Sequence, residues 1–203
     1  MSRFVALVLA ALFVFSSAPA TGAQSSADVI IGDLDTYWRA EFEAAGREYW
    51  SPGIVVLGEP INTSCGTLSS SFGPGAYCSA NGTLYYAPVW FMTFADGGHD
   101  FAMMTVLAHE WGHHVQLMLG IQWRADKSYE LQADCLSGAY AAHAELMGLA
   151  PAGALADSIR LAALSGDVGS LPRDAPEHGG GAERAISFMN GYQSGISGCG
   201  IIL

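Results

Sequence analysis

The stretch of residues 101–119 constrains the fold most, because its apolar side chains point to nearly every side of a helix. A helix of that kind is buried in the middle of its domain. Gly120 follows directly and predicts the end of the helix. The rest of the domain must therefore be built around this segment.

Two histidines lie four residues apart in this helix, within the sequence His109-Glu110-Trp111-Gly112-His113. Positions 109 and 113 differ by about 40° around the helix axis, so both imidazoles leave the same face and can share one metal ion. Glu110 lies about 60° beyond His113, where it suits a general base better than a third ligand. The alternative is a structural pair of histidines. We disfavour it, because these groups buried without a metal would leave costly unpaired polar atoms.

A catalytic zinc ion needs a third protein ligand, commonly His or Glu, and leaves its remaining position to water. Residues 127–147 predict the next helix, and Glu130 and Asp134 lie four apart on one face of it. We predict Glu130 as the third ligand and Asp134 as the acceptor of the free ring N–H of His109. An ordinary solvated helix face is the alternative. Small residues near that face would let the two helices approach: Ala133, Gly138 and Ala141.

The remaining pattern predicts an α+β fold with a small early sheet and helices after it. Residues 34–49 have helical periodicity, with Asp33 or Asp35 as the cap. Short strands are predicted over 54–57, 83–86 and 89–94, and further helices over 154–164 and 181–195. No repeat or interdomain linker is evident, so residues 24–203 are predicted to form one domain.

Residues 1–23 have the three parts of a secretory signal: a basic residue (Arg3), an apolar run and then small residues. The apolar run has about 12 residues against the roughly 20 that cross a bilayer, so we prefer a cleaved signal to a membrane anchor. Cleavage after Ala20 and cleavage after Ala23 both fit. We expect a secreted or extracytoplasmic chain without a stable membrane anchor.

The four cysteines favour disulfides over free thiols in a chain sent to an oxidising compartment. We favour pairing Cys65 with Cys78, because they bracket a Ser/Gly/Pro-rich loop. Pairing Cys135 with Cys199 would then tie the end of the chain to a central helix. Spacing alone leaves the other two arrangements open.

The charge of the chain limits its partners. Eight basic residues stand against nineteen acidic ones, which gives a formal net charge of -11. Nucleic-acid binding depends on Lys and Arg neutralising phosphates, so this balance argues against a nucleic acid and against an anionic membrane surface. Neutral or cationic peptide or protein substrates are the expected partners.

Together with their flanking residues, these motifs resemble the neutral zinc metallopeptidases, a family of the gluzincin group that contains thermolysin. The resemblance rests on residues 109–116 (HEWGHHVQ), 130–135 (ELQADC), His178-Gly179, Arg184, Phe188, Gly191-Tyr192, Cys65-Gly66 and Tyr77-Cys78. It implies a zincin-like domain in which His109, His113 and Glu130 bind one Zn²⁺ ion and Glu110 is the catalytic base. The chain departs from the family pattern at Ser79 and Ala87, where a proline and an acidic residue are expected. These departures concern the substrate cleft rather than metal binding.

The activity that follows is zinc-dependent hydrolysis of peptide bonds, with a metal-activated water and Glu110 as general base. His178 is the candidate donor to the developing oxyanion, with an ordinary loop histidine as the alternative. Tyr85 or Tyr86 could serve instead. Two other functions stay open, a non-catalytic zinc- and peptide-binding protein and a zinc amidase acting on cell-wall peptides. Glu110 argues against the non-catalytic one, since a purely structural site would not need it.

Overall fold

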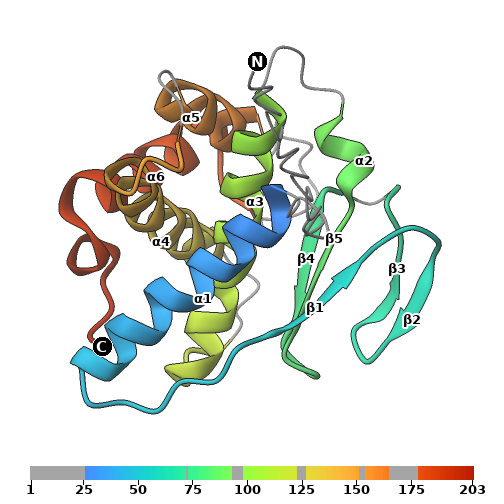
Figure 1. Cartoon of the computed structure of the whole chain (residues 1–203), viewed down its shortest axis with the longest axis horizontal. Helices are drawn as coiled ribbons and strands as arrows, with labels where there is room; N and C mark the ends of the chain where they lie inside the picture. The colour runs from blue at the N-terminus through green and yellow to red at the C-terminus, as the bar shows by residue number, and fades with distance from the viewer. Residues whose placement is uncertain (1–25, 72, 93–97, 123–126, 151–153, 165–177) are drawn as a thin grey trace, which may run out of the picture.

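The computed structural model describes residues 26–71, 73–92, 98–122, 127–150, 154–164 and 178–203. In chain order they form α1 (Ser26–Ala44), β1 (Gly53–Val56), β2 (Ile61–Thr63), β3 (Gly66–Leu68), β4 (Gly75–Cys78), β5 (Thr83–Tyr86), α2 (Pro88–Phe91), α3 (Gly98–Met118), α4 (Lys127–Leu146), α5 (Ala154–Leu164), α6 (Gly181–Ser194) and the 3₁₀ helix η1 (Ile196–Cys199). The fold is α+β, as the sequence predicts, with the strands on one side of the helices (Figure 1). The predicted signal lies outside the described residues.

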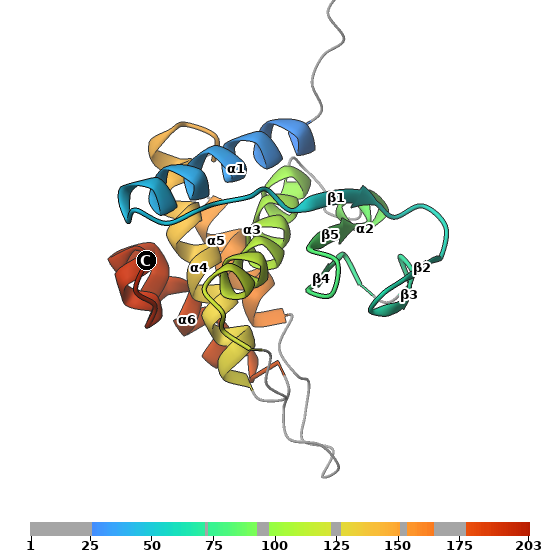
Figure 2. The same ribbon diagram turned by 90° about the horizontal axis from the view of Figure 1, so that it is seen from below.

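Helix α3 lies at the centre of the molecule, with α1, α4 and α5 around it and the sheet on its remaining side (Figure 2). Leu107, Trp111 and Val115 are almost wholly buried. The predicted buried helix is therefore confirmed. It ends at Met118, and Gly120 follows with a positive φ of 71°, a conformation that glycine reaches without strain.

The sheet has the strand order β1-β5-β4, with β1 parallel and β4 antiparallel to β5, while β2 and β3 form a separate hairpin. The N–H of Ala87 donates to the carbonyl of Pro74. Because hydrogen-bonded pairs alternate along antiparallel strands, the backbone N–H and C=O groups of Gly75 and Tyr77 point away from β5. Among the described strands β4 is thus an edge, and it lies against α3.

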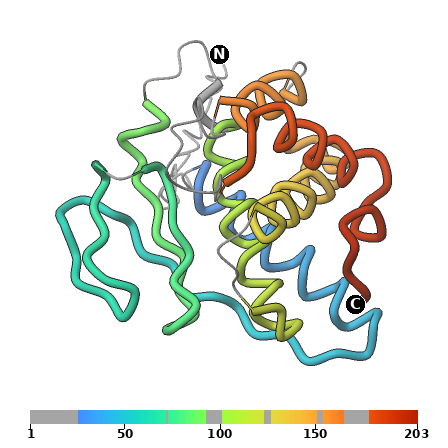
Figure 3. Tube along the Cα trace, turned by 180° about the vertical axis from the view of Figure 1, so that it is seen from behind, coloured from blue at the N-terminus to red at the C-terminus, as the bar shows by residue number. Residues whose placement is uncertain are grey.

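Helices α4 and α6 lie side by side on the face away from the sheet (Figure 3). Their contact depends on two glycines: a Cβ on Gly138 would lie 1.9 Å from the carbonyl oxygen of Phe188, and one on Gly191 would lie 1.8 Å from that of Cys135. Gly138 therefore serves the contact with α6, and its expected role between α3 and α4 is wrong. Gly112 is the glycine that allows α3 and α4 to approach, since a Cβ there would lie 3.0 Å from the backbone of Ala133.

Gly138→Ala is expected to lower the free energy of unfolding by about 3 kcal/mol, because the added methyl overpacks two backbones that cannot separate easily. Urea denaturation measures this loss. Gly32→Ala in α1 is the matched control, since a Cβ there meets nothing within 4 Å. That variant should be neutral or more stable by up to about 1 kcal/mol. A loss for Gly138→Ala below about 0.5 kcal/mol would contradict the close approach of α4 and α6.

The N-terminal third of the chain departs most from the predicted elements. Helix α1 begins at Ser26 and ends at Ala44, so the predicted range 34–49 is wrong at both ends. The predicted strand at 89–94 is wrong where it is described, because Pro88 starts the short helix α2, a position that proline favours. Strands β2, β3 and β4 were missed, since their few residues show no clear alternation.

Two disulfides join Cys65 with Cys78 and Cys135 with Cys199, which confirms the favoured pairing. The first ties β4 to the turn between β2 and β3, and the second ties η1 to α4. Disulfides of this kind are typical of proteins outside the cytosol. Within the described part of the chain, no helix is long and apolar enough to cross a membrane.

Candidate metal centre

Three side chains from two helices converge at the centre of the molecule, His109 and His113 from α3 and Glu130 from α4. The carboxylate of Glu130 lies 3.2 Å from Nε2 of His109 and 3.4 Å from Nε2 of His113. One ligand atom from each residue can be chosen so that all lie within 4.8 Å of one another. The structure thus brings together the three residues that the sequence proposes as ligands.

The spacing and chemistry of these atoms fit a zinc ion. A tetrahedral ion with ligand distances of about 2.0–2.2 Å holds its ligand atoms about 3.3–3.6 Å apart. Nε2 of His109 lies 3.2 Å from Oε2 of Glu130, and Nε2 of His113 lies 3.4 Å from Oε1 of the same carboxylate. Since one ligand atom from each residue lies within 4.8 Å of the others, the three side chains would draw slightly closer together around an ion. Two imidazole nitrogens with one carboxylate oxygen are also a donor set of catalytic zinc sites. The three side chains keep 10–17% of their surface exposed, so water and substrate can reach an ion held there.

Asp134 holds the other ring nitrogen of His109, with Oδ1 2.9 Å from Nδ1. Arg184 from α6 binds the same carboxylate, donating from Nε to Oδ2 and from Nη2 to Oδ1, both at 2.7 Å, and its Nη2 lies 3.4 Å from Nδ1 of His109. Both side chains are almost fully buried. Asp134 lies where the sequence predicts. Arg184 came only from the family resemblance, because no local pattern indicates that this arginine would be buried against α4.

His113 has different neighbours from His109. Its Nδ1 lies 2.8 Å from Oε1 of Gln116, one turn further along α3. Its ring stacks on Tyr129, with ring centroids 4.9 Å apart. Sequence reasoning missed both partners. The spacing of three residues on one helix face is the signal that could have found Gln116, whereas Tyr129 comes from another helix and left no such signal.

The cluster shifts the pKa values of its own members. Burial lowers the pKa of His109, but the charge of Asp134 and hydrogen bonds with Asp134 and Glu130 outweigh it and raise the pKa to about 10. Burial, together with the charge of His109, lowers the pKa of His113 to about 4. Burial raises the pKa of Glu130, but hydrogen bonding to His109 and its charge outweigh it and lower the pKa to about 2. His113 and Glu130 thus have the protonation states that metal binding requires, while His109 has a proton to release.

Glu110 lies beside the ligands with only 9% of its surface exposed. Burial raises the pKa of its carboxyl to about 7, against the opposing charge of His109, and the backbone N–H of Tyr77 in β4 donates to it. Gly75 leaves room for this carboxyl, since a Cβ there would lie 3.2 Å from Oε1. The side chain is held between α3 and the edge strand with a pKa near neutrality, which suits a general base.

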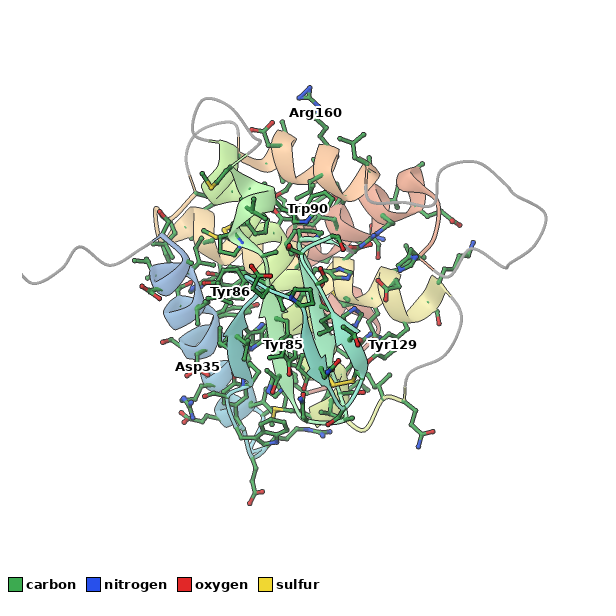
Figure 4. The ribbon with its side chains drawn as sticks, turned by 90° about the vertical axis from the view of Figure 1, so that its right-hand side faces the viewer. Asp35, Tyr85, Tyr86, Trp90, Tyr129 and Arg160 are labelled. Atoms are coloured by element: carbon green, nitrogen blue, oxygen red, sulfur yellow. A yellow bond between two sulfur atoms is a disulfide. The ribbon has the colours of Figure 1, made fainter. Side chains whose placement is uncertain are left out.

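A cavity of about 700 Å³ lies over the cluster, within the usual size range of small-ligand sites. The three candidate ligands and Glu110 form part of its wall, and apolar side chains form another part, among them Trp90, Phe91, Val106 and Leu161. Figure 4 looks onto the sheet side of the molecule and shows Trp90 above the ends of the strands and Tyr129 beside the sheet. The cavity thus has apolar side chains on one part of its wall and charged groups on another.

The candidate oxyanion donors are placed differently. His178 is exposed and lines the cavity. Tyr85 and Tyr86 are buried and are not among the residues that line the cavity. The structure therefore brings His178 to the site and neither tyrosine. Of the two departures from the family pattern, Ser79 lines the cavity and Ala87 is buried.

The chain matches the family described as "Putative neutral zinc metallopeptidase" over residues 15–200. It is 32% identical over 194 residues to "Uncharacterized protein YpfJ" of Escherichia coli K12, a match that covers 82% of this chain and 67% of the relative. It is 33% identical over 178 residues to "Uncharacterized protein Rv2575" of Mycobacterium tuberculosis H37Rv, covering 72% of this chain and 60% of the relative.

The chain thus spans about two thirds of the length of these relatives. No solved structure matches it. The family match covers most of the chain, including both helices of the metal centre and the edge strand. The chain therefore belongs to the family of neutral zinc metallopeptidases.

Proposed function

We propose that this protein is a secreted zinc-dependent peptidase, with His109, His113 and Glu130 as the ligands of one Zn²⁺ ion. The observation that carries the proposal is the convergence of these three side chains within 4.8 Å, next to a buried carboxyl at Glu110. A structural zinc site usually has four protein ligands and is closed. Three ligands beside a cavity and a base support a catalytic site instead.

Zinc bound here supplies a Lewis acid that polarises a carbonyl group and makes water more acidic. Side chains of the protein transfer the proton and stabilise the developing negative charge. Glu110 accepts the proton of the attacking water on a carboxylate oxygen and then passes it to the nitrogen of the leaving amine. Its raised pKa of about 7 lets the same group take up and give back a proton near neutral pH. His178, on the cavity wall, donates to the oxyanion of the tetrahedral intermediate.

The edge strand β4 supports a peptide as the substrate. Gly75 and Tyr77 line the cavity, and their backbone N–H and C=O groups point away from β5. Because the N–H of Tyr77 donates to Glu110, the groups that would pair with a peptide are the N–H and C=O of Gly75 and the C=O of Tyr77. An extended peptide can add to such an edge through main-chain hydrogen bonds, which read the backbone and not the sequence. The net charge of -11 favours neutral or cationic peptides over anionic polymers.

Secretion is supported by two observations that do not depend on the metal centre. Residues 1–23 have the pattern of a signal sequence. The described part of the chain also contains two disulfides, which form and persist in oxidising compartments.

Removal of the metal is expected to abolish hydrolysis of a fluorogenic peptide, and one equivalent of Zn²⁺ should restore it, because the base alone cannot polarise the carbonyl. The measurement combines metal analysis with peptide assays before chelation, after it and after readdition. Activity that persists in protein shown to be free of metal would contradict the proposal. Parallel assays with casein and with purified cell wall separate the alternatives: cell-wall release without casein cleavage would indicate an amidase, and zinc binding without either activity a binding protein.

A further inference from the structure

His113 can bind a metal through Nε2 only if its ring hydrogen lies on Nδ1. The proposed metal centre does not by itself explain what keeps the hydrogen there. We propose that Gln116 and Gln132 form a directional amide relay, anchored on two backbone carbonyls, that fixes the hydrogen of His113 on Nδ1. The lone pair of Nε2 is then directed at the metal centre before any ion binds. This inference rests on the proposed function, since it assigns a role to the surroundings of one proposed ligand.

The orientation of the Gln116 amide follows from its partners. Its Nε2 lies 2.8 Å from the backbone carbonyl oxygen of Tyr129 and 3.0 Å from Oε1 of Gln132. A carbonyl oxygen can only accept, so the atom facing Tyr129 must be the NH₂ group. Oε1 of Gln116 therefore faces Nδ1 of His113, 2.8 Å away, and an amide oxygen can only accept there. The hydrogen must lie on Nδ1 of His113.

A second amide fixes the first. Nε2 of Gln132 donates to the backbone carbonyl of Cys199 at 3.1 Å, so Oε1 of Gln132 must be the atom that faces Gln116. Cys199 is held in place by its disulfide to Cys135 in α4. The relay thus runs from the C-terminal η1 segment through α4 to α3. Reversing either amide would place two acceptors or two donors against each other.

Fixing the hydrogen on Nδ1 has a direct consequence for the other ring nitrogen. A neutral imidazole has one N–H, so Nε2 of His113 keeps a lone pair. That atom lies 3.4 Å from Oε1 of Glu130, inside the cluster of ligand atoms. In the other tautomer Nε2 would carry the hydrogen and could not bind a metal until the proton moved.

The two ligand histidines are therefore held by different chemistry. His109 faces the carboxylate of Asp134, which a guanidinium holds. His113 faces the neutral amide of Gln116, which adds no further charge beside the buried Glu110 and the partly buried Glu130. Gln116 is fully buried, where an amide without partners would be costly. If Gln116 were only structural, its amide would be hydrogen-bonded but its removal would leave the tautomer of His113 unchanged. If it is part of the relay, its removal changes that tautomer, so the two roles can be told apart.

The test records long-range ¹H–¹⁵N NMR spectra of the metal-free protein with ¹⁵N-labelled histidine, together with zinc affinity by chelator competition. The wild type should show His113 as the Nδ1–H tautomer. Gln116→Met, which keeps the length of the side chain but removes the amide, should let the Nε2–H tautomer appear and weaken zinc binding about 10- to 100-fold. Gln132→Met should shift both readouts the same way by less. Gln193→Met, at an exposed glutamine of α6, should match the wild type.

An Nε2–H tautomer in the wild type, or an unchanged tautomer in both relay variants, would overturn the proposal. If Gln116→Met does not fold, Gln132→Met decides, because Gln132 is only partly buried. The outcome is also separate from that of the proposed function. A wild type that shows the Nδ1–H tautomer but binds no zinc contradicts the metal centre and supports the relay. A wild type that binds zinc but shows a mixture of tautomers supports the metal centre and contradicts the relay.

Discussion

Glu110→Gln is expected to lower the rate of peptide hydrolysis by about 10²–10⁴-fold, the contribution typical of general acid–base catalysis, while zinc stays bound. The amide keeps the size of the side chain and its place between α3 and β4. It cannot accept the proton of water or return it to the leaving nitrogen. Glu110 is not one of the three residues whose atoms converge on the cluster, so its replacement should leave the metal content at one ion per chain.

Steady-state kinetics and metal analysis on the same preparation measure both parts of this result. Glu43→Gln, which removes an exposed carboxylate of α1, is the matched control and should behave as the wild type. Near-normal turnover in Glu110→Gln would remove this residue from the role of base. Loss of zinc from the same variant would instead identify it as a ligand.

Asp134→Ala is expected to have two large effects at once. The free energy of unfolding should fall by about 3–5 kcal/mol, because the buried charge of Arg184 would lose the carboxylate that accepts from its Nε and Nη2. The affinity for zinc should fall about 10- to 100-fold, because His109 would lose the acceptor that orients its ring. Both follow from one carboxylate, whose Oδ1 contacts His109 and whose two oxygens both accept from Arg184.

A second variant separates these two effects. Replacing the pair by apolar residues of similar size, Asp134→Leu with Arg184→Met, removes both buried charges and should recover most of the lost stability. It should not recover zinc affinity, since His109 still lacks its acceptor. Urea denaturation and chelator competition measure the two quantities, and Asp157→Ala, at an exposed aspartate of α5, is the control. Recovery of zinc affinity in the double variant would show that Asp134 acts through stability alone.

The sequence predicts the metal centre well because its main signals are local. His109 and His113 share a face by helical geometry, and so do Glu130 and Asp134 on the next helix. The convergence of the two faces needs one further condition, a close approach of α3 and α4, which Gly112 and Ala133 provide. Spacing along each helix therefore indicates which residues belong to the site, and the packing of the two helices brings them together.

The residues that sequence reasoning missed act across elements. Gln132 reaches His113 only through Gln116, and Arg184, which the sequence offered only through the family resemblance, reaches Asp134 and His109 from α6. Nothing in the local sequence around either residue indicates those contacts. The sequence pattern places the edge strand β4 within a loop, because four residues with two glycine or alanine positions show little β propensity. Its identity as a strand depends on pairing with β5 and on the disulfide at Cys78, both of which are tertiary.

A crystal structure of the zinc-loaded protein, with anomalous diffraction measured at the zinc edge, tests the metal centre most directly. We expect a single zinc peak within about 2.0–2.2 Å of Nε2 of His109, Nε2 of His113 and a carboxylate oxygen of Glu130, with Glu110 beside the ion but not bound to it. A zinc peak at another place, or a site in which Glu130 points away from the ion, would contradict the assignment of these three ligands.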